Sequence, residues 1–438
     1  LLLNGEASGS QTPVVIPFDP NANTLQTLEI SSNNAKEVQW EGGLSVSGTA
    51  TVGAGNTLTI STGAIQNNGT IRIEDNASLL QTASGVNNNS GSGTYEVTTS
   101  VTYRDQQAYK LWSSPVQSAT FQDVFGSSSS APTTQNDWYR WEASNQGWST
   151  QGAIAQTNNL EYGRGYTITP APFGGTNPAS ITESRTFSGV INNGDQVYTE
   201  NVTGSDITGD NVDDRYMLVG NPYPSAININ TFMSDNGNLT GVAYFFDAAN
   251  NAANAGYAEY ATGSQTGTAA YTGGSVPDEF VAVGQGFFVE ATADGNNSLN
   301  FSNNQRTSGN NVQFFKRQNQ VLNIHRSWFT LTNDLGSSDN IAIVLQNEAT
   351  ANFDLGKDAP VWKRYNGLNF YSILGQKDLA IQALDQDLKD DKMIPLGLDV
   401  ARAGQFTIAL DSLSNWPGHS IALLDSAQGT LTDLRQSD

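Results

Sequence analysis

Short runs of alternating apolar and polar residues, separated by glycine, asparagine and serine, recur along almost the whole chain. This alternation is typical of β-strands that bury one face. It predicts an all-β protein with a short N-terminal β-solenoid followed by tandem antiparallel, jelly-roll-like β-sandwich domains. We expect an N-terminal extension (1–24), solenoid-like repeats (25–95), a sandwich region (96–311) and a second sandwich (312–438), truncated at its C-terminus.

The solenoid prediction depends on three short runs, Leu44-Ser45-Val46, Leu58-Thr59-Ile60 and Ile71-Arg72-Ile73, which follow one another at nearly regular intervals. Regular repetition is typical of stacked turns in which each strand buries the inner face of its neighbours. A meander of hairpins would give a similar pattern, so the sequence leaves both arrangements open.

The stretch 216–225, Tyr-Met-Leu-Val-Gly-Asn-Pro-Tyr-Pro-Ser, predicts a buried strand that ends in a rigid corner. Each proline keeps the residue before it out of the helical region, and Gly220 tolerates a positive φ. We expect the ring of Tyr223 to be exposed at this corner.

An earlier stretch, 109–115, has the same Tyr-x-Leu-x-x-x-Pro spacing as 216–222. A second match follows in the same order, between Gly163-Arg164-Gly165-Tyr166 and Gly284-Gln285-Gly286-Phe287. We therefore interpret residues of about 100–305 as two related halves. Chance similarity in a β protein rich in glycine and tyrosine is the alternative, because each match alone is weak.

Composition narrows the expected partners. The chain has 42 acidic and 20 basic residues and a net charge of −22. Nucleic acids and anionic membranes attract basic patches, so we expect neither as a partner. The absence of cysteine excludes disulfides and thiolate metal ligands. No apolar run approaches the roughly 18 residues of a membrane-spanning helix, so we expect no transmembrane segment.

Several motifs together resemble those of large cell-surface and secreted proteins of Bacteroidota that are exported by the type IX secretion system. They are Leu-Val-Gly-Asn-Pro-Tyr-Pro-Ser (218–225), Gly-Gln-Gly-Phe-Phe-Val (284–289), Arg-Ser-Trp-Phe-Thr-Leu (326–331), Phe-Asp-x-Gly-Lys-Asp-Ala (353–359) and the pair 423–425 and 432–434. The resemblance covers about 100–438. It implies an extracellular or cell-surface location and the type IX machinery as a partner, although the family's C-terminal sorting domain is absent from this sequence.

Catalytic motifs are sparse. The two histidines, His325 and His419, do not belong to a Gly-x-Ser-x-Gly or His-Glu-x-x-His pattern. A glycosidase would need two carboxylates at a suitable separation, and the sequence does not pair any of the available ones. We therefore expect a non-catalytic protein. The available carboxylates are Glu161, Glu183, Asp247, Glu259, Glu279 and Glu290.

The acidic loop 206–214 is the candidate metal site. It places Asp206, Asp210, Asp213 and Asp214 within nine residues, and hard cations such as calcium prefer several oxygen ligands at once. The spacing does not match an EF-hand loop, and a solvated loop whose aspartates stabilise turns is the alternative.

A group of tryptophans is the candidate ligand-binding site. Trp138, Trp141 and Trp148 lie among asparagine, glutamine and serine residues, and exposed indoles in such surroundings can stack on the rings of an extracellular polysaccharide. Burial in a core is the alternative, because a large ring on a strand usually packs inside. Trp138 and Trp141 are three residues apart, so on a strand they face opposite sides.

The resemblance also implies modification sites. Ser412 and Ser426 lie in Asp-Ser-apolar triplets, the pattern used for O-glycosylation in that bacterial group. The function that we expect is adhesion or structural display on the cell surface. Two alternatives are a self-assembling filament or sheath subunit, which would bind copies of itself, and an accessory carbohydrate-binding region of a secreted polysaccharide-degrading enzyme.

Overall fold

The structure is a computed structural model in which 52% of the residues lie in strands and 4% in helices, which confirms the predicted all-β class. The chain divides into two compact units. Unit 1 consists of Leu1–Ile207, Asp213–Leu239 and Glu279–Phe315, and unit 2 of Thr208–Val212, Thr240–Asp278 and Lys316–Asp438. The described residues are 2–4, 14–16, 24–31, 36–83, 85, 88–126, 137–170, 180–207, 212–248, 255–311, 324–364, 367–388 and 391–436.

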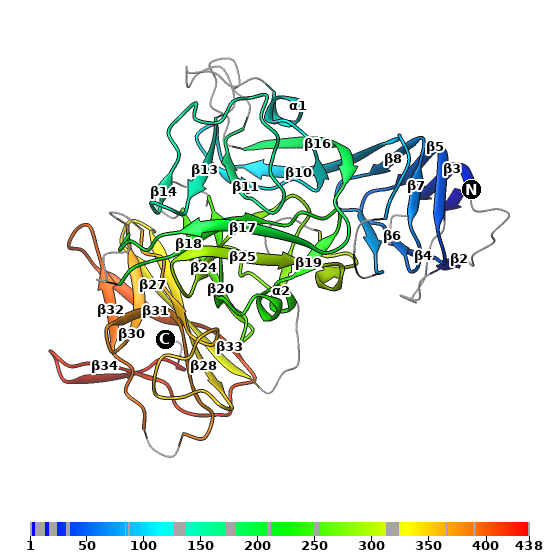
Figure 1. Ribbon diagram of the computed structural model, residues 1–438. Coiled ribbons are helices and arrows are strands. Elements are labelled where there is room, and N and C mark those ends of the chain that lie inside the picture. The colour runs from blue at the N-terminus through cyan, green and yellow to red at the C-terminus, as the bar shows by residue number, and fades with distance from the viewer. Residues whose placement is uncertain are drawn as a thin grey trace. The chain divides into compact units, whose positions relative to one another are not determined.

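Unit 1 begins with a β-solenoid of about three turns over residues 15–97 (Figure 1, blue). Its strands are parallel to their neighbours within each of two sheets, so the solenoid prediction is confirmed and the hairpin meander is excluded. One sheet contains β1 (Leu2–Asn4), β3 (Thr24–Ser31), β5 (Leu44–Val52), β7 (Ile65–Asn67), β8 (Thr70–Ile73) and β10 (Thr94–Tyr103); the other contains β2 (Val14–Ile16), β4 (Glu37–Trp40), β6 (Thr57–Ile60) and β9 (Ser78–Gln81).

The repeating unit differs from the series of runs that suggested it. Leu44 and Ile71 belong to one sheet, whereas Leu58 lies on β6 in the other. Each turn therefore contributes a strand to both sheets, and the sequence series mixed the two. Along the first sheet, one inward-facing ladder runs across four neighbouring strands and is at most 1% exposed; it consists of Ile30, Val52, Ile73 and Val97.

The last solenoid strand also begins an antiparallel sheet. β10 pairs over nine residues with β16 (Ile181–Ile191), which pairs in turn with β12 (Val116–Gln117). Along β10 the buried residues Tyr95, Val97, Val101 and Tyr103 alternate with half-buried or exposed threonine, serine and glutamate. The solenoid core therefore continues into the sheet that follows, without a linker between them.

The two stretches that resemble each other form equivalent strand pairs within unit 1. β11 (Lys110–Trp112) pairs with β15 (Tyr166–Ile168), and β18 (Tyr216–Gly220) pairs with β24 (Gly286–Ala291). Leu111 lies opposite Thr167, and the matching Leu218 lies opposite Phe288. Because the register is the same in both pairs, the sequence matches correspond to matching structure.

The corner after β18 is buried, contrary to our expectation that Tyr223 would be exposed. The Tyr223 side chain has 0% exposure, and its hydroxyl donates to the carbonyl of Gly194 at 2.8 Å. The amide of Asn221 donates to the carbonyls of Ser225, Val281 and Ala282, so it fixes the turn from within. A tyrosine between two prolines signalled a rigid turn but not the side to which the ring points.

This corner also closes the end of the solenoid. The carbonyl of Pro224 accepts from the backbone N–H of Leu79 on β9 at 2.8 Å. Arg306 donates to the carbonyl of Leu79 and to the hydroxyl of Ser225. Neighbouring elements of unit 1 are β17 (Gln196–Val202) paired with β25 (Gly295–Phe301), β19 (Ala226–Asn228) between β23 (Phe280–Val281) and β26 (Arg306–Thr307), α2 (Ile229–Asp235) and η1 (Asn303–Gln305).

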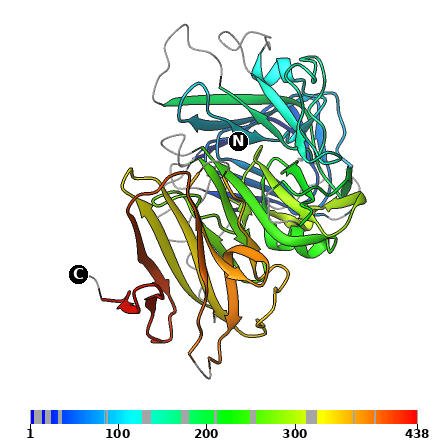
Figure 2. The same ribbon diagram turned by 90° about the vertical axis from the view of Figure 1, so that its left-hand side faces the viewer.

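Unit 2 is built around a seven-stranded sheet whose strands lie side by side in Figure 2, from gold to dark red. Its longest strand pair buries Leu331 and Ile341 on the same side as Phe370. The strands are β27 (His325–Asn333), β28 (Ser338–Gln346), β29 (Ala359–Pro360), β30 (Asn369–Leu374), β31 (Lys377–Asp385), β32 (Leu396–Asp399) and β33 (Phe406–Ser414). The same unit contains β20 (Leu239–Asp247) from Thr240 onward, together with β21 (Gly256–Ala261) and β22 (Thr266–Thr268).

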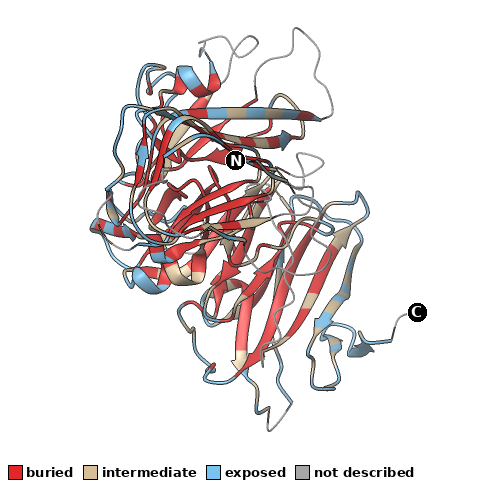
Figure 3. Ribbon diagram, turned by 90° about the vertical axis from the view of Figure 1, so that its right-hand side faces the viewer, coloured by how far each residue is buried: buried red, intermediate tan, exposed pale blue. Residues whose placement is uncertain are grey.

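A separate hairpin, β34 (Ala422–Asp425) and β35 (Thr430–Asp433), ends the described chain. Figure 3 shows it mostly as exposed, and Leu424 and Leu431 are 44% and 71% exposed. None of the helices in the described part of the chain is long and apolar enough to cross a membrane.

Candidate functional site

The predicted tryptophan site lies on a four-stranded sheet of unit 1 with the order β11-β15-β13-β14. β13 (Trp138–Glu142) and β14 (Gly147–Trp148) form a hairpin, and its turn contains Gln146 at a φ of 47°. The Gln146 amide both donates to and accepts from the backbone of Tyr216 on β18. The hairpin is therefore held against the strand that precedes the Asn-Pro-Tyr-Pro corner.

Trp138 and Trp141 point to opposite faces of this sheet, as their spacing predicts, and each is buried in a separate core. Trp138 stacks on Phe121 of α1 (Phe121–Phe125), with ring centres 5.1 Å apart, and donates its indole N–H to the carbonyl of Ile154. Trp141 donates its indole N–H to the carbonyl of Tyr216 at 3.0 Å. With both exposures at 5% or below, neither ring has a free face for a ligand.

Trp148 is the exposed member of the predicted set. It lies directly opposite Trp141 in the hairpin, so the two side chains share a face, and it remains 41% exposed. Its ring meets Trp141 and Phe288 edge-on, with centres 5.3 and 5.8 Å apart. These contacts fix the orientation of the indole while part of its surface stays open to solvent.

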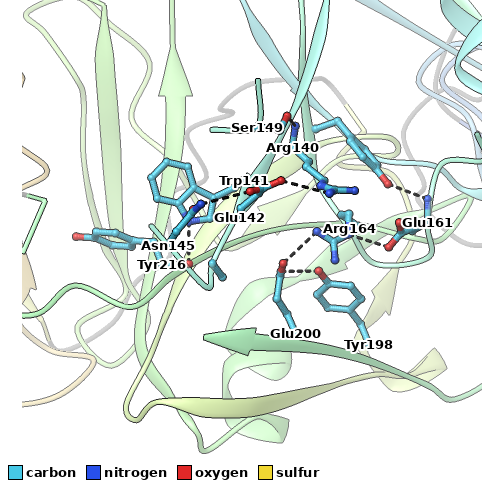
Figure 4. Close-up of polar contacts among 12 residues, drawn as sticks. Arg140, Trp141, Glu142, Asn145, Ser149, Glu161, Arg164, Tyr198, Glu200 and Tyr216 are labelled. Atoms are coloured by element: carbon cyan, nitrogen blue, oxygen red, sulfur yellow. Dashed lines mark hydrogen bonds and ion pairs between the residues drawn. The ribbon is translucent and has the colours of Figure 1, made fainter. Parts of the chain in front are cut away.

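A network of charged side chains lies beside this hairpin (Figure 4). The Arg164 guanidinium pairs with Glu161 at 2.9 Å and with Glu200 at 3.0 Å, and it lies over the ring of Tyr198. The Tyr198 hydroxyl donates to the second oxygen of Glu200 at 2.5 Å. On β13, Arg140 pairs with Glu142 at 3.2 Å.

The electrostatics of this network follow from burial. Burial raises the pKa of Glu200, although Arg164 and the Tyr198 hydroxyl act in the opposite direction. Burial also raises the pKa of Tyr198, and the neighbouring Glu200 carboxylate raises it further. For Arg164 burial favours loss of the charge, but the surrounding Tyr198, Glu200 and Glu161 outweigh it and raise its pKa. One guanidinium thus binds two carboxylates, a geometry that positions β17 against the turn before β15.

Two other candidate carboxylates are also bound to protein groups. Glu183 pairs with Arg185 at 2.5 Å, and Glu259 accepts from the Thr268 hydroxyl and from the backbone of Trp362. Of the two histidines, His325 contacts the carbonyl of Asn415 through Nδ1, and the carbonyl of His419 accepts from the indole of Trp416.

The acidic loop is described only in part, because Asp210 lies outside the described residues. Asp214 is buried and accepts the backbone N–H of Ile207, Asp213 lies 3.8 Å from Arg215, and Asp206 is exposed. Within the described segments, no three His, Cys, Asp or Glu side chains form a metal-binding group. Calcium binding stays a prediction; a chelator should lower the melting temperature unless Asp206 and Asp213 are replaced by asparagine, and no chelator effect would end it.

The predicted modification sites differ in surroundings. Ser426 is exposed in the turn of the β34–β35 hairpin, where Asp425 accepts the next backbone N–H groups. Ser412 is half-buried on β33, and its hydroxyl donates to Asp411 at 3.1 Å. Occupancy of either serine stays a prediction, and the intact mass of native protein would decide it.

Two aromatic residues outside the predicted tryptophan group share the face of Trp148. Tyr109 precedes β11 and Tyr139 lies on β13; both rings are half-buried and meet edge-on with centres 6.3 Å apart. Alternation from Trp141 places Tyr139 on the same side of β13. The sequence offers one indication of Tyr109, because each of the two related halves has a tyrosine two residues before the matching leucine. Tyr109 therefore corresponds to the buried Tyr216.

These features define a β-solenoid joined to antiparallel sheets, with a partly exposed aromatic face on one of them. Residues 7–438 match the model of a domain of unknown function, DUF8693, and the chain belongs to this family. Neither a curated protein nor a solved structure matches the chain.

Proposed function

We propose that this protein is a non-catalytic extracellular surface protein, an adhesin or structural scaffold, exported by the type IX secretion system. The resemblance of its motifs to exported Bacteroidota proteins supports the location. The acidic composition, with a net charge of −22, is compatible with a soluble outer surface and does not favour nucleic acid as a partner.

The observation that carries the proposal is that buried charged groups connect strands and corners. Arg306 is 8% exposed and donates to Leu79, Asn193, Ser225 and Asn303, which come from separate parts of unit 1. In unit 2, Arg364 donates to Asp339, whose other oxygen accepts the backbone N–H of Phe370. Charges engaged in this way stabilise a rigid framework, which suits a protein that holds a position.

Labelling of intact cells tests the proposed location. The full-length gene product carries an epitope tag in the exposed turn of the β34–β35 hairpin, and a cytoplasmic protein with the same tag is the control. Antibody should label intact cells as strongly as permeabilised cells, and deletion of the type IX machinery should abolish surface label. Signal that appears only after permeabilisation would contradict the proposal.

Self-assembly into a filament or sheath is a second candidate, favoured by the edge of the sheet in unit 2. β33 is the last strand in the sheet order, and its Phe406, Ile408 and Leu410 side chains are only partly buried against the core. Edge strands with an apolar face can pair with another chain. Electron microscopy of native material would show filaments in this case, and sedimentation as a monomer would argue against it.

The third candidate function is that of an accessory region of a polysaccharide-degrading enzyme. Such a region would bind carbohydrate, as an adhesin can. The full gene would distinguish the two, because only the accessory region is joined to a catalytic domain.

A further inference from the structure

The half-buried rings of Tyr109 and Tyr139 come from two segments that are not adjacent in the sheet, since Tyr109 directly precedes β11 and Tyr139 lies on β13. β15 lies between β11 and β13, and adjacent strands are about 4.8 Å apart, so the two backbones are separated by roughly 10 Å. The ring centres are nevertheless only 6.3 Å apart. The side chains therefore lean toward each other across β15, above Thr167, which pairs with Tyr139 and is buried.

Polar groups lie beside this pair of rings. Asp137 is two residues before Tyr139 and therefore on the same face of the strand. Its side chain accepts from the Gln151 amide at 3.1 Å, and its backbone bonds to Thr169. Burial raises the pKa of the Tyr109 and Tyr139 hydroxyls, and the negative charge of Asp137 also acts to raise both.

The related half of the chain shows that the strand itself does not require this exposure. Tyr216 occupies the position that matches Tyr109 in the Tyr-x-Leu-x-x-x-Pro stretch, and it is 1% exposed. The same Tyr-x-Leu-x-x-x-Pro spacing thus occurs with one tyrosine buried and the other half-buried. A tyrosine ring that is apolar on its faces and polar at its tip suits contact with a ligand that has both characters.

We propose that Tyr109, Tyr139 and Asp137 form a binding surface for a neutral polysaccharide, with Trp148 on the same sheet face as a second stacking position. This inference rests on the proposed surface function and names its ligand class. Sugar rings present apolar C–H faces to aromatic side chains and hydroxyl donors to a carboxylate, which can accept up to four hydrogen bonds. Both types of group are present here.

Charge decides between neutral and anionic polymers. The ring pair lies next to a carboxylate, on a chain with a net charge of −22. Uronate or sulfate groups would be repelled by this field, whereas a neutral glucan or mannan would not. Sites for small ligands typically combine aromatic walls with a few polar groups that set orientation, and this surface has that composition on a fixed sheet.

Native affinity electrophoresis of the full chain tests the inference. Gels contain glucomannan, laminarin or starch as neutral probes, or alginate and polygalacturonate as anionic ones. At least one neutral polymer should retard the protein, and Tyr109→Ala with Tyr139→Ala should weaken that binding about tenfold or more. Tyr109→Phe with Tyr139→Phe should retain most of it because the rings remain, and Asp137→Asn should weaken it less than the double alanine variant.

The matched control removes two exposed apolar side chains elsewhere, through Leu424→Ala with Leu431→Ala, and should leave retardation unchanged. Thermal melting shows whether each variant is folded; if the alanine pair is not, the phenylalanine pair and Asp137→Asn decide. Retardation by no neutral polymer, by anionic polymers only, or to the same extent in the alanine variant would overturn the inference. Cell-surface labelling is independent of these gels, so a protein displayed on cells that binds no glycan would refute this inference alone.

Discussion

The backbone N–H of Ser113 donates to the carbonyl of Gly284 at 2.9 Å, and this hydrogen bond has a counterpart. Gly220, which matches Ser113, donates to the carbonyl of Gly163, which matches Gly284, at 3.0 Å. In each half of the chain, the residue at the end of the strand therefore donates a hydrogen bond to the glycine turn of the other half. The reciprocal bonds define a local two-fold relation between the β11–β15 and β18–β24 pairs within unit 1.

The two glycine turns should be sensitive to substitution. Gly163 and Gly284 have φ values of 68° and 72°, a left-handed conformation that costs a residue with a Cβ about 1–2 kcal/mol. A Cβ at Gly163 would also lie 2.9 Å from the Phe301 ring, whereas one at Gly284 would have its nearest contact at 3.3 Å. In denaturant titrations we expect Gly163→Ala to lower the stability of unit 1 more than Gly284→Ala does.

Gly237→Ala is the control for this pair, because its backbone is not left-handed and no atom lies within 4 Å of an added Cβ. Its unfolding midpoint should stay close to that of the parent protein. Equal stability of Gly163→Ala and Gly237→Ala would show that the reciprocal turns do not constrain the fold.

Arg306 should be among the most sensitive residues of unit 1. Its guanidinium carbon lies 4.9 Å from the centre of the Tyr223 ring, and burial lowers its pKa to about 10. Arg306→Leu removes donors from several buried oxygens, and each unsatisfied group costs about 1–3 kcal/mol. We expect a loss of about 3 kcal/mol or more, measured by denaturant unfolding.

A surface arginine provides the comparison. Arg72 pairs with Glu96 at 2.7 Å, and its side chain is 51% exposed. Exposed ion pairs contribute about 0–1 kcal/mol, so Arg72→Leu should change the midpoint little. Similar losses for the two variants would mean that Arg306 does not hold the corner and the solenoid together.

Unit 2 should lose stability as the pH rises toward 8, because of Glu259. Burial and, to a smaller extent, the nearby Asp339 raise the pKa of this carboxyl from 4.5 to about 8, although the hydrogen bonds from Thr268 and Trp362 and the charge of Arg364 act in the opposite direction. The folded state therefore binds more protons than the unfolded state between those values, and stability falls as pH rises through that window. The free energy of unfolding falls by about 1.4 kcal/mol for each tenfold difference in proton affinity between the folded and the unfolded state.

Glu259→Gln should reduce this dependence, because a neutral amide can replace the protonated carboxyl beside Thr268. Unfolding midpoints of unit 2 at pH 6.5 and 8.5 measure the effect. Both pH values lie above the pKa of about 6 to which burial raises Asp358. The exposed residue Glu348 serves as control, and Glu348→Gln should retain the parent slope. An unchanged pH dependence of stability in Glu259→Gln would contradict the assignment of this dependence to Glu259.

Local pattern was sufficient to predict the fold class and the solenoid, but not the packing. The apolar run 216–219 predicts a buried strand, and all of its residues are buried. The sequence did not show that the ring of Tyr223 is buried as well, because its hydroxyl bonds to Gly194, which is distant in the sequence. The solenoid repeat was misread because runs such as Leu58 and Leu44 look alike, and only the parallel pairing assigns them to different sheets.

The candidate site shows the same limit. The spacing of Trp138 and Trp141 predicted opposite faces, but it did not show that each face has its own core. Exposure of Tyr109 depends on the strands that surround it, since Tyr216 has the same Tyr-x-Leu-x-x-x-Pro spacing and is buried. Residues that come together only through strand order, such as Tyr109 and Tyr139, leave no spacing signal in the sequence.

The most direct test of the account combines retention and turnover in one experiment. The full chain is incubated with insoluble glucomannan, and both the bound protein and newly formed reducing ends are measured over several hours. We expect the protein to sediment with the polymer through Tyr109 and Tyr139, and reducing ends to stay at the level of a protein-free control. Release of reducing ends that is lost on changing Glu161 or Glu200 to glutamine would contradict it.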